Sequence, residues 1–333
     1  MQKSKLSSRS RPGSLPRLFQ HGDRPWQGVI ILISALVIIL MLSIGGMLWA
    51  KSAGARTTFG WSFLTPTVNP NWDPVNNHFQ AWPFLFGTLL TSIFAIIFAL
   101  PIGLGIAIFL AELCPAWLRT PLTWMVELLA AIPSVIYGLW GIFIFLPKVV
   151  APFGAFLGNT LGKVPVLGAL FTGPIPASGA SRLAASLVLT IMIIPTIAAV
   201  SRDVFLAIPG SQREAAKALG ATEWETIWQI LIPYGRSGIL GAVILGLGRA
   251  LGETMAVTMV IGNSIQGGVS LLQPGYTMAS IIANEFAEAV SGLHTDSLIE
   301  IGLVLFIITL LLNILARYLV WQVARQTPQE ARV

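Results

Sequence analysis

A few charged side chains stand in stretches that are otherwise apolar, and they carry the clearest potential for chemistry. Arg249 and Glu253 are four residues apart, which places them on one face of a predicted helix. Glu127 and Glu300 stand in two other apolar stretches. A charge at bilayer depth costs about 3 kcal/mol or more, so each must face a bundle interior, a partner chain or water. Two interpretations stay open: a structural ion pair, or a pathway in which Arg249 meets an anion.

Other motifs that could do chemistry fail on spacing. Residues 158–163 are similar to a phosphate-binding loop, but the spacing is one residue short and Val164 replaces the required Ser or Thr. Residues 246–252 have the wrong spacing for a dinucleotide fingerprint. Cys114 is the single cysteine, which excludes an intrachain disulfide. The three histidines lie far apart in sequence, and no spacing indicates a metal site. We therefore expect no catalytic, cofactor or metal site in this chain.

One polar stretch, residues 211–233, stands between two long apolar runs. Pro209 and Gly210 end the preceding helix, and Ser211 with Glu214 has the spacing of a capping box. A short helix is predicted over residues 212–219, and Gly220 supplies the left-handed residue that closes it.

A second capping box, Thr222 with Glu225, starts the next predicted helix. Its apolar residues recur at i, i+3, i+4 and i+7 as one stripe: Trp224, Ile227, Trp228 and Leu231. Pro233 is predicted to end this helix. Two short helices with a Gly corner in such an apolar chain indicate a docking surface for a soluble partner.

Composition places this stretch in a membrane protein. The 333 residues are 55% hydrophobic and 10% charged, whereas soluble domains carry about a quarter charged residues. Six runs approach the roughly 20 residues that span a bilayer: 27–49, 83–111, 121–147, 182–206, 236–262 and 297–323. The net charge of +6 is explained better by topology than by nucleic acid, because the basic residues are unevenly distributed.

The distribution of Lys and Arg predicts the orientation. Residues 1–25 form a basic, disordered tail, and residues 201–235 and 324–333 hold further Arg and Lys. The loops on the other side of the membrane contain only five basic residues: Lys51, Arg56, Lys148, Lys163 and Arg182. Both termini are therefore predicted in the cytoplasm. A short amphipathic helix is predicted over 277–290 on the outer side, as a cap on the bundle or as a contact for a binding protein.

The sequence resembles a known family at several points. Glu214-Ala215-Ala216, Gly220 and Ile230–Pro233 look like the EAA loop of ABC importer permeases. Four further stretches look like the C-type permease subunits of the phosphate-specific (Pst) ABC importers: 127–141, 192–205, 245–257 and 283–294. The resemblance covers most of residues 83–323.

This resemblance implies an all-α, polytopic fold of six transmembrane helices with a MetI-like permease core over residues 26–323. It implies a prokaryotic plasma (inner) membrane location, an A-type permease as heterodimer partner, two ATP-binding subunits, and a periplasmic or extracellular phosphate-binding protein. No cofactor belongs to the chain itself, because ATP and Mg are used by the partner ATPase. The residues expected to couple to that ATPase are Ser211, Arg213, Glu214, Ala215, Ala216 and Gly220, and those expected along the substrate pathway are Arg249, Glu253 and Glu127.

Two alternatives remain at this stage. A permease of the same family could move another oxyanion, such as molybdate or sulfate. An ion-coupled secondary transporter would need no ATPase and usually shows internal repeats, of which the sequence gives no convincing sign.

Overall fold

The computed structural model describes residues 23–66, 72–165, 167–265, 268–290 and 292–325, and it is built of helices. Six helical segments of this part are long and apolar enough to cross a membrane: 26–51, 82–113, 134–163, 182–206, 223–252 and 292–323. The all-α prediction with six spans is thus confirmed. The chain divides into two units, residues 1–47 and 48–333.

The described part of the first unit is one helix. Helix α1 runs over Asp23–Lys51, and its described apolar side chains are exposed around the whole circumference up to Met47. A helix that is apolar on every face is suited to lipid. The predicted basic tail, residues 1–25, lies outside the described residues except for its last three, which begin α1.

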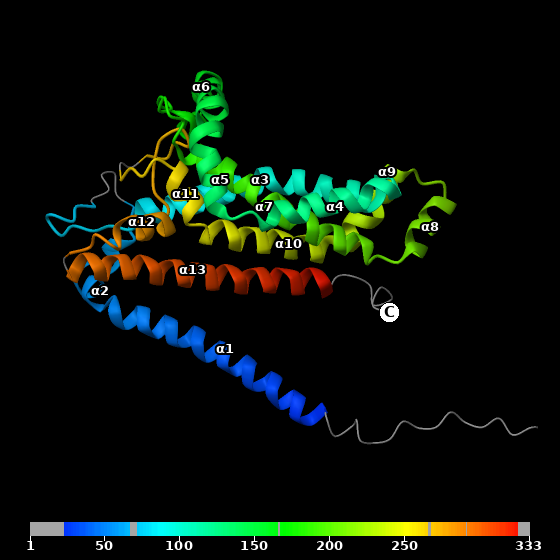
Figure 1. Ribbon diagram of the computed structural model, residues 1–333, viewed down its shortest axis with the longest axis horizontal. Coiled ribbons are helices and arrows are strands. Elements are labelled where there is room, and N and C mark those ends of the chain that lie inside the picture. The colour runs from blue at the N-terminus through cyan, green and yellow to red at the C-terminus, as the bar shows by residue number, and fades with distance from the viewer. Residues whose placement is uncertain (1–22, 67–71, 166, 266–267, 291, 326–333) are drawn as a thin grey trace, which may run out of the picture. The chain divides into compact units, whose positions relative to one another are not determined.

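The second unit is a bundle around α7 (Arg182–Leu206), with α3 (Trp82–Ile108) and α10 (Ile232–Gly252) packed against it. Helix α13 (Gly292–Arg325) lies beside α10 (Figure 1). Small residues allow the close approach: a Cβ on Gly103 of α3 would come within 2.9 Å of Ile197 in α7. Pro101 and Pro195 stand inside α3 and α7 without ending them.

Shorter elements cover the two ends of this unit. Helices α8 (Gly210–Ala218) and α9 (Glu223–Thr226) lie at one end, and α2 (Ala53–Phe59) and α12 (Met278–Glu285) at the other (Figure 1). The remaining elements are the 3-10 turns 60–63, 161–163 and 167–171 and the π-turns 109–113, 141–150 and 227–231, together with α4 (Ala116–Ala131), α5 (Ser134–Trp140), α6 (Ala151–Thr160) and α11 (Met255–Val260). Polar residues of 211–233 are thereby separated from α2 and α12 by the length of the bundle (Figure 1).

The third span differs from the prediction of one helix over 121–147. Helix α4 ends at Ala131, Ile132 is extended with ψ 128°, and α5 begins at Ser134. The break lies at Pro133, whose ring disfavours the helical conformation of the residue before it. The Tyr137 hydroxyl donates a hydrogen bond to the Leu129 carbonyl at 2.9 Å, which satisfies one acceptor near the break.

The fifth span also differs from its prediction, 236–262. The helix is continuous from Glu223 through a π-turn, 227–231, and α10, and it ends at Gly252. Pro233 was predicted to end the preceding helix, but it stands in the first turn of α10. A proline is tolerated there, and the wider π-turn before it accommodates the missing N–H. The helix predicted to start at Thr222 and the fifth span therefore form one continuous helical segment, 223–252.

Candidate functional site

Helix α8 begins differently from the sequence prediction. Pro209 is its N-cap residue with an extended ψ of 135°, and Gly210 is already helical, so Ser211 lies inside the first turn. No side chain caps this end, and the predicted Ser211–Glu214 capping box is wrong. The reason is local: the fixed φ of Pro209 suits the residue before a helix and starts α8 two residues earlier than predicted.

The corner after α8 has the predicted geometry. Gly220 has φ +88°, and its N–H donates to the Lys217 carbonyl at 3.0 Å. The capping box of α9 is also confirmed: the Thr222 N–H donates to Glu225 Oε2 at 2.8 Å, and the Glu225 N–H donates to Thr222 Oγ1 at 3.2 Å. Positive φ strongly favours glycine, so Gly220 sets the direction of α9 relative to α8.

One side chain anchors α8 to the membrane helices. Arg213 forms an ion pair with Glu112, with Nη2 to Oε1 at 2.8 Å, and its Nε donates to the same carboxylate at 3.1 Å. Its Nη1 and Nη2 also donate to the carbonyls of Ile208 and Phe205, at 2.7 and 2.6 Å. Both charged side chains are largely buried, 18% and 13% exposed. Arg213 thus joins α8 to the carbonyl end of α7 and to the π-turn after α3, with the charge sign that a helix C-terminus favours.

The outer side of α8 is open. Glu214 and Ala215 are exposed, Ala216 is half-buried, and Leu219 is 91% exposed. A cavity of about 340 Å³ lies beside the corner, between Ala216, Gly220 and Glu225. Most of the predicted docking residues are therefore small and lie at the surface together with Glu214, and the exposed Leu219 adds one large apolar side chain beside them. Arg213 is the exception that faces inward.

The predicted apolar stripe of α9 divides into two. Ile227 and Leu231 are buried in the cluster under the corner, whereas Trp224 and Trp228 are more than half exposed. The two indole rings pack edge to face with centroids 5.7 Å apart. A π-turn over 227–231 changes the angular spacing, so four residues at helical spacing do not share one face.

Arg249 and Glu253 do not share a helix face as predicted. Arg249 is half-buried in the last turn of α10, while Glu253 lies past its end with an extended ψ of 123°. Glu253 Oε1 accepts a hydrogen bond from the Ala256 N–H at 3.2 Å and so caps α11. The interpretation of an i, i+4 ion pair is wrong because the helix stops at Gly252 between the two residues. Arg249 has no hydrogen bond or ion pair with any residue that the structure describes.

Glu127 is paired elsewhere. Its Oε1 lies 3.6 Å from Nη2 of Arg202 near the end of α7, and Arg202 also pairs with Asp203 at 2.7 Å. Among the described residues, no ion pair joins any two of the three side chains predicted along the substrate pathway. The role of Arg249, Glu253 and Glu127 in that pathway stays a prediction.

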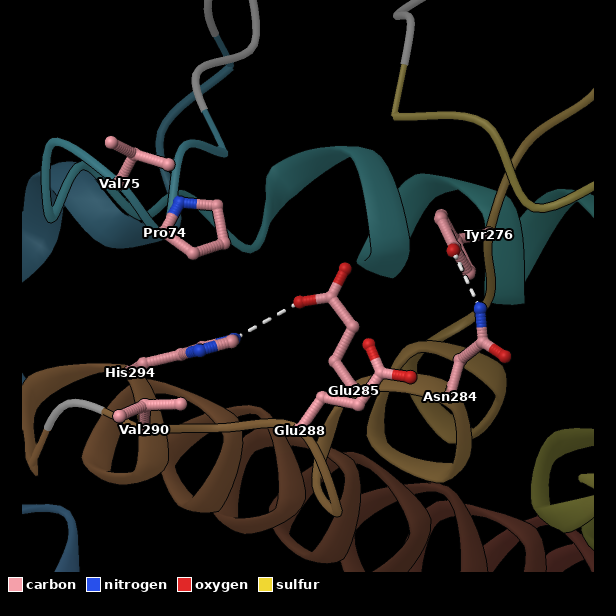
Figure 2. A pocket seen from close by; sticks show the side chains of 8 residues that line it. All are labelled: Pro74, Val75, Tyr276, Asn284, Glu285, Glu288, Val290 and His294. Atoms are coloured by element: carbon pink, nitrogen blue, oxygen red, sulfur yellow. Dashed lines mark hydrogen bonds and ion pairs between the residues drawn. The ribbon is translucent and has the colours of Figure 1, made fainter.

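A pocket of about 570 Å³ lies at the opposite end of the bundle (Figure 2). Glu285 is its central side chain: its Oε2 accepts from Trp72 Nε1 at 2.8 Å and lies 3.0 Å from His294 Nε2. Asn284 donates to the Tyr276 hydroxyl at 2.9 Å, and burial raises the pKa of that phenol. Glu288 lines the pocket as well, and the lining contains no Lys or Arg, while its one histidine, His294, is paired with Glu285. The pocket is therefore acidic.

The helix under this pocket is shorter than predicted. Helix α12 covers Met278–Glu285 rather than 277–290, and Thr277 caps it with Ser280. Met278 and Ile281 are fully buried on the inner face of this helix, but Phe286 is half exposed beyond the helix end. Sequence spacing found the buried face, while the acidic pocket depended on contacts from Trp72 and His294 that no local pattern signals.

Similarity to known proteins is extensive. Residues 103–326 match the family described as the inner membrane component of binding-protein-dependent transport systems. The phosphate transport system permease protein PstC of Mesorhizobium japonicum is 43% identical over 96% of both chains. PstC of Haemophilus influenzae is 47% identical over 87% of this chain and 90% of that protein.

Solved structures share the fold. A bacterial ABC transporter for the acidic polysaccharide alginate is 16% identical, has a TM-score of 0.58 and covers 94% of this chain and 100% of that one. The MetNI methionine ABC transporter in an inward-facing conformation is 20% identical, with a TM-score of 0.51 over 71% and 93% of the two chains. These findings confirm the MetI-like permease core. The chain therefore belongs to the inner membrane components of binding-protein-dependent transport systems, as a multi-pass membrane protein.

Proposed function

We propose that this chain is a permease subunit of an ATP-driven importer that moves inorganic phosphate across the plasma membrane of a prokaryote. The relatives over 96% of its length are phosphate transport permeases, which supports the substrate. The structural observation that carries the proposal is α8: its outer side is open, and its inner side is fixed to α7 and α3 by Arg213. A helix held in this way transmits a displacement instead of absorbing it.

The open side of α8 docks on an ATP-binding subunit, and a complete importer contains two such subunits and an A-type permease beside this chain. ATP and Mg are bound and hydrolysed in the partner. Closure of the ATPase pair moves α8, and two routes carry the movement into the bundle. One route runs through Arg213 and Glu112 to α3 and α7, and the other through the Gly220 corner to α9 and α10.

At the end of the second route stands Arg249. A guanidinium with its donors unused inside the described part of the chain can offer two parallel hydrogen bonds to a phosphate oxygen pair. We assign Arg249 the role of meeting phosphate in the pathway between the two permeases. Glu253 shapes the site indirectly, since it fixes the start of α11 next to Arg249.

The acidic pocket at the opposite end receives the phosphate-binding protein. Glu285 and Glu288 favour a basic contact surface, and charge complementarity raises the rate of encounter more than the final affinity. This arrangement requires α8 in the cytoplasm and α12 on the outer side, as the distribution of Lys and Arg predicts, with both termini in the cytoplasm.

Transport by the complete complex in vesicles tests the proposal. We expect phosphate uptake that requires ATP, the ATP-binding subunits and the binding protein. A tenfold excess of sulfate or molybdate should leave this uptake nearly unchanged, which requires a discrimination well above tenfold, that is, well above about 1.4 kcal/mol. Uptake of sulfate or molybdate at the same rate as phosphate would contradict the assignment of phosphate as the substrate. Phosphate uptake driven by an ion gradient without ATP would replace the importer by a secondary transporter.

A further inference from the structure

A second cavity, of about 470 Å³, lies between α2, the turn after it and α13. Most of its wall is apolar and comes from one face of α13, where Leu303, Val304 and Ile307 follow one another. Two charged side chains, Arg56 and Glu300, line it as well. Neither the coupling route nor the proposed substrate pathway uses this cavity.

Glu300 is the unusual member of the lining. It is only 6% exposed, and its Oε2 has no hydrogen-bond partner in the part of the chain that the structure describes. A buried carboxylate without a donor is unfavourable, by more than the cost of a neutral polar group. The carboxylate therefore has an unmet requirement for a donor, best supplied by a cation.

Arg56 does not meet that requirement. Its guanidinium lies over the Trp49 ring at 3.6 Å, its Nε donates to Ser52 Oγ at 3.2 Å, and its Nη2 donates to the Trp49 carbonyl. No ion pair joins Arg56 to Glu300 among the described residues, although the two line one cavity. The cavity thus presents a positive and a negative group held apart by the protein. A ligand with one anionic and one cationic group matches both.

The position of the cavity points to a lipid. Trp49 and Trp61 are 57% and 84% exposed at its edge, and tryptophan is enriched at the level of lipid headgroups. Glu300 is eight residues into α13, about 12 Å along the helix axis, so it lies at the border between headgroups and hydrocarbon. Ile307 is 39% exposed further along α13, in the apolar part of the cavity wall.

We propose that this cavity binds one aminophospholipid of the phosphatidylethanolamine type. The lipid phosphate accepts from Arg56, the ammonium donates to Glu300, and an acyl chain lies along Leu303 and Ile307. Phosphatidylcholine has a cation without an N–H and gives Glu300 no donor. Phosphatidylglycerol has no cation and leaves the carboxylate unneutralised. The site therefore selects by headgroup.

Native mass spectrometry of the purified complex tests the site, with lipids of identical acyl chains added in turn. We expect the wild type to retain one phosphatidylethanolamine at least about tenfold more tightly than phosphatidylcholine, the equivalent of one charge-assisted hydrogen bond. Glu300→Gln removes the charge and should reduce this preference to about twofold or less. Glu127→Gln removes a carboxylate that pairs with Arg202 and should keep the preference.

A second variant makes the result independent of any folding defect at Glu300. Ile307→Trp changes a partly exposed position and fills the cavity, so it should abolish retention of every lipid at this site while the complex stays assembled. The proposal is wrong if the wild type retains the three lipids equally, or if Glu300→Gln keeps the preference. It is also wrong if no lipid is retained, as when a partner helix fills the cavity.

Discussion

Arg213 and Arg249 both lie near helix ends, but their surroundings differ. Arg213 is enclosed by a carboxylate and two backbone carbonyls, and all of its donor nitrogens are used. Arg249 forms no hydrogen bond or ion pair with a carboxylate or a carbonyl in the described part of the chain. A fully paired charge fixes geometry, whereas an unpaired charge in a membrane protein is costly and is retained where a ligand uses it. This contrast is the basis for the proposed division of roles, in which Arg213 transmits movement and Arg249 meets the substrate.

Replacement of Arg213 by glutamine should have the largest effect on stability. It leaves Glu112 largely buried without its partner, which costs about 3–5 kcal/mol. Differential scanning calorimetry of the purified complex should show a lower Tm for Arg213→Gln. The double variant Arg213→Gln with Glu112→Gln should recover most of the lost Tm. Lys217→Gln is the matched control, since its pair with Glu223 is exposed and worth about 1 kcal/mol at most. A double variant no more stable than the single one would show that Arg213 does more than neutralise Glu112.

The same exchange at Arg249 should give the opposite pattern. Arg249→Gln should reduce phosphate uptake in vesicles by about ten- to a hundredfold, the loss expected for hydrogen bonds to a charged group, while ATPase activity persists. Adding Glu253→Gln should not restore uptake, because the two side chains are not paired, and glutamine can still cap α11. Recovery of near-normal uptake in the double variant would show that Arg249 has only a structural role.

Gly220→Val tests the corner that joins the transmitting parts. A β-branched residue at φ +88° costs on the order of 1–3 kcal/mol, so the angle between α8 and α9 should change. We expect normal membrane insertion, with ATP-binding subunit association and uptake lowered about fivefold or more. Gly105→Val is the control, because Gly105 has equal space for a side chain but no positive φ. Wild-type assembly and uptake would show that the corner has no role in docking.

Labelling of single cysteines changes the molecule least and tests whether the two ends face opposite sides. Cysteines at Ser178 and Gln212, in a Cys114→Ser background, should react from outside and inside respectively. An impermeant maleimide on intact cells should modify only the first, and the second should react after permeabilisation. Modification of both on intact cells would contradict the topology on which the comparison depends.

Local signals were sufficient at the corner between α8 and α9, but not at the start of α8, where Pro209 rather than Ser211 precedes the helix. Gly220 and the Thr222–Glu225 box were predictable because each feature is set within four residues of chain. The break at Pro133 was also signalled by the proline, although proline inside α3 and α7 is tolerated, so the signal alone does not decide.

Contacts distant in sequence were beyond prediction. Glu112 and Arg213 are 101 residues apart, and no spacing rule connects them. The error at Glu253 has another origin: glycine is common inside transmembrane helices, so Gly252 gave no reason to end α10 there. The prediction continued the helix past Gly252 and therefore placed Glu253 on the same face as Arg249, although Glu253 lies outside the helix.

The continuous helix from Glu223 to Gly252 has a mechanical consequence. Its 30 residues form a lever arm about 45 Å long, with the corner at one end and Arg249 close to the other. A tilt of about 5° around the corner would carry the far end through about 4 Å, from the length of the arm alone. In the proposed importer, a small rotation of an ATP-binding subunit docked on α8 would thereby be amplified into a displacement of this size beside Arg249, without any change in the helix itself.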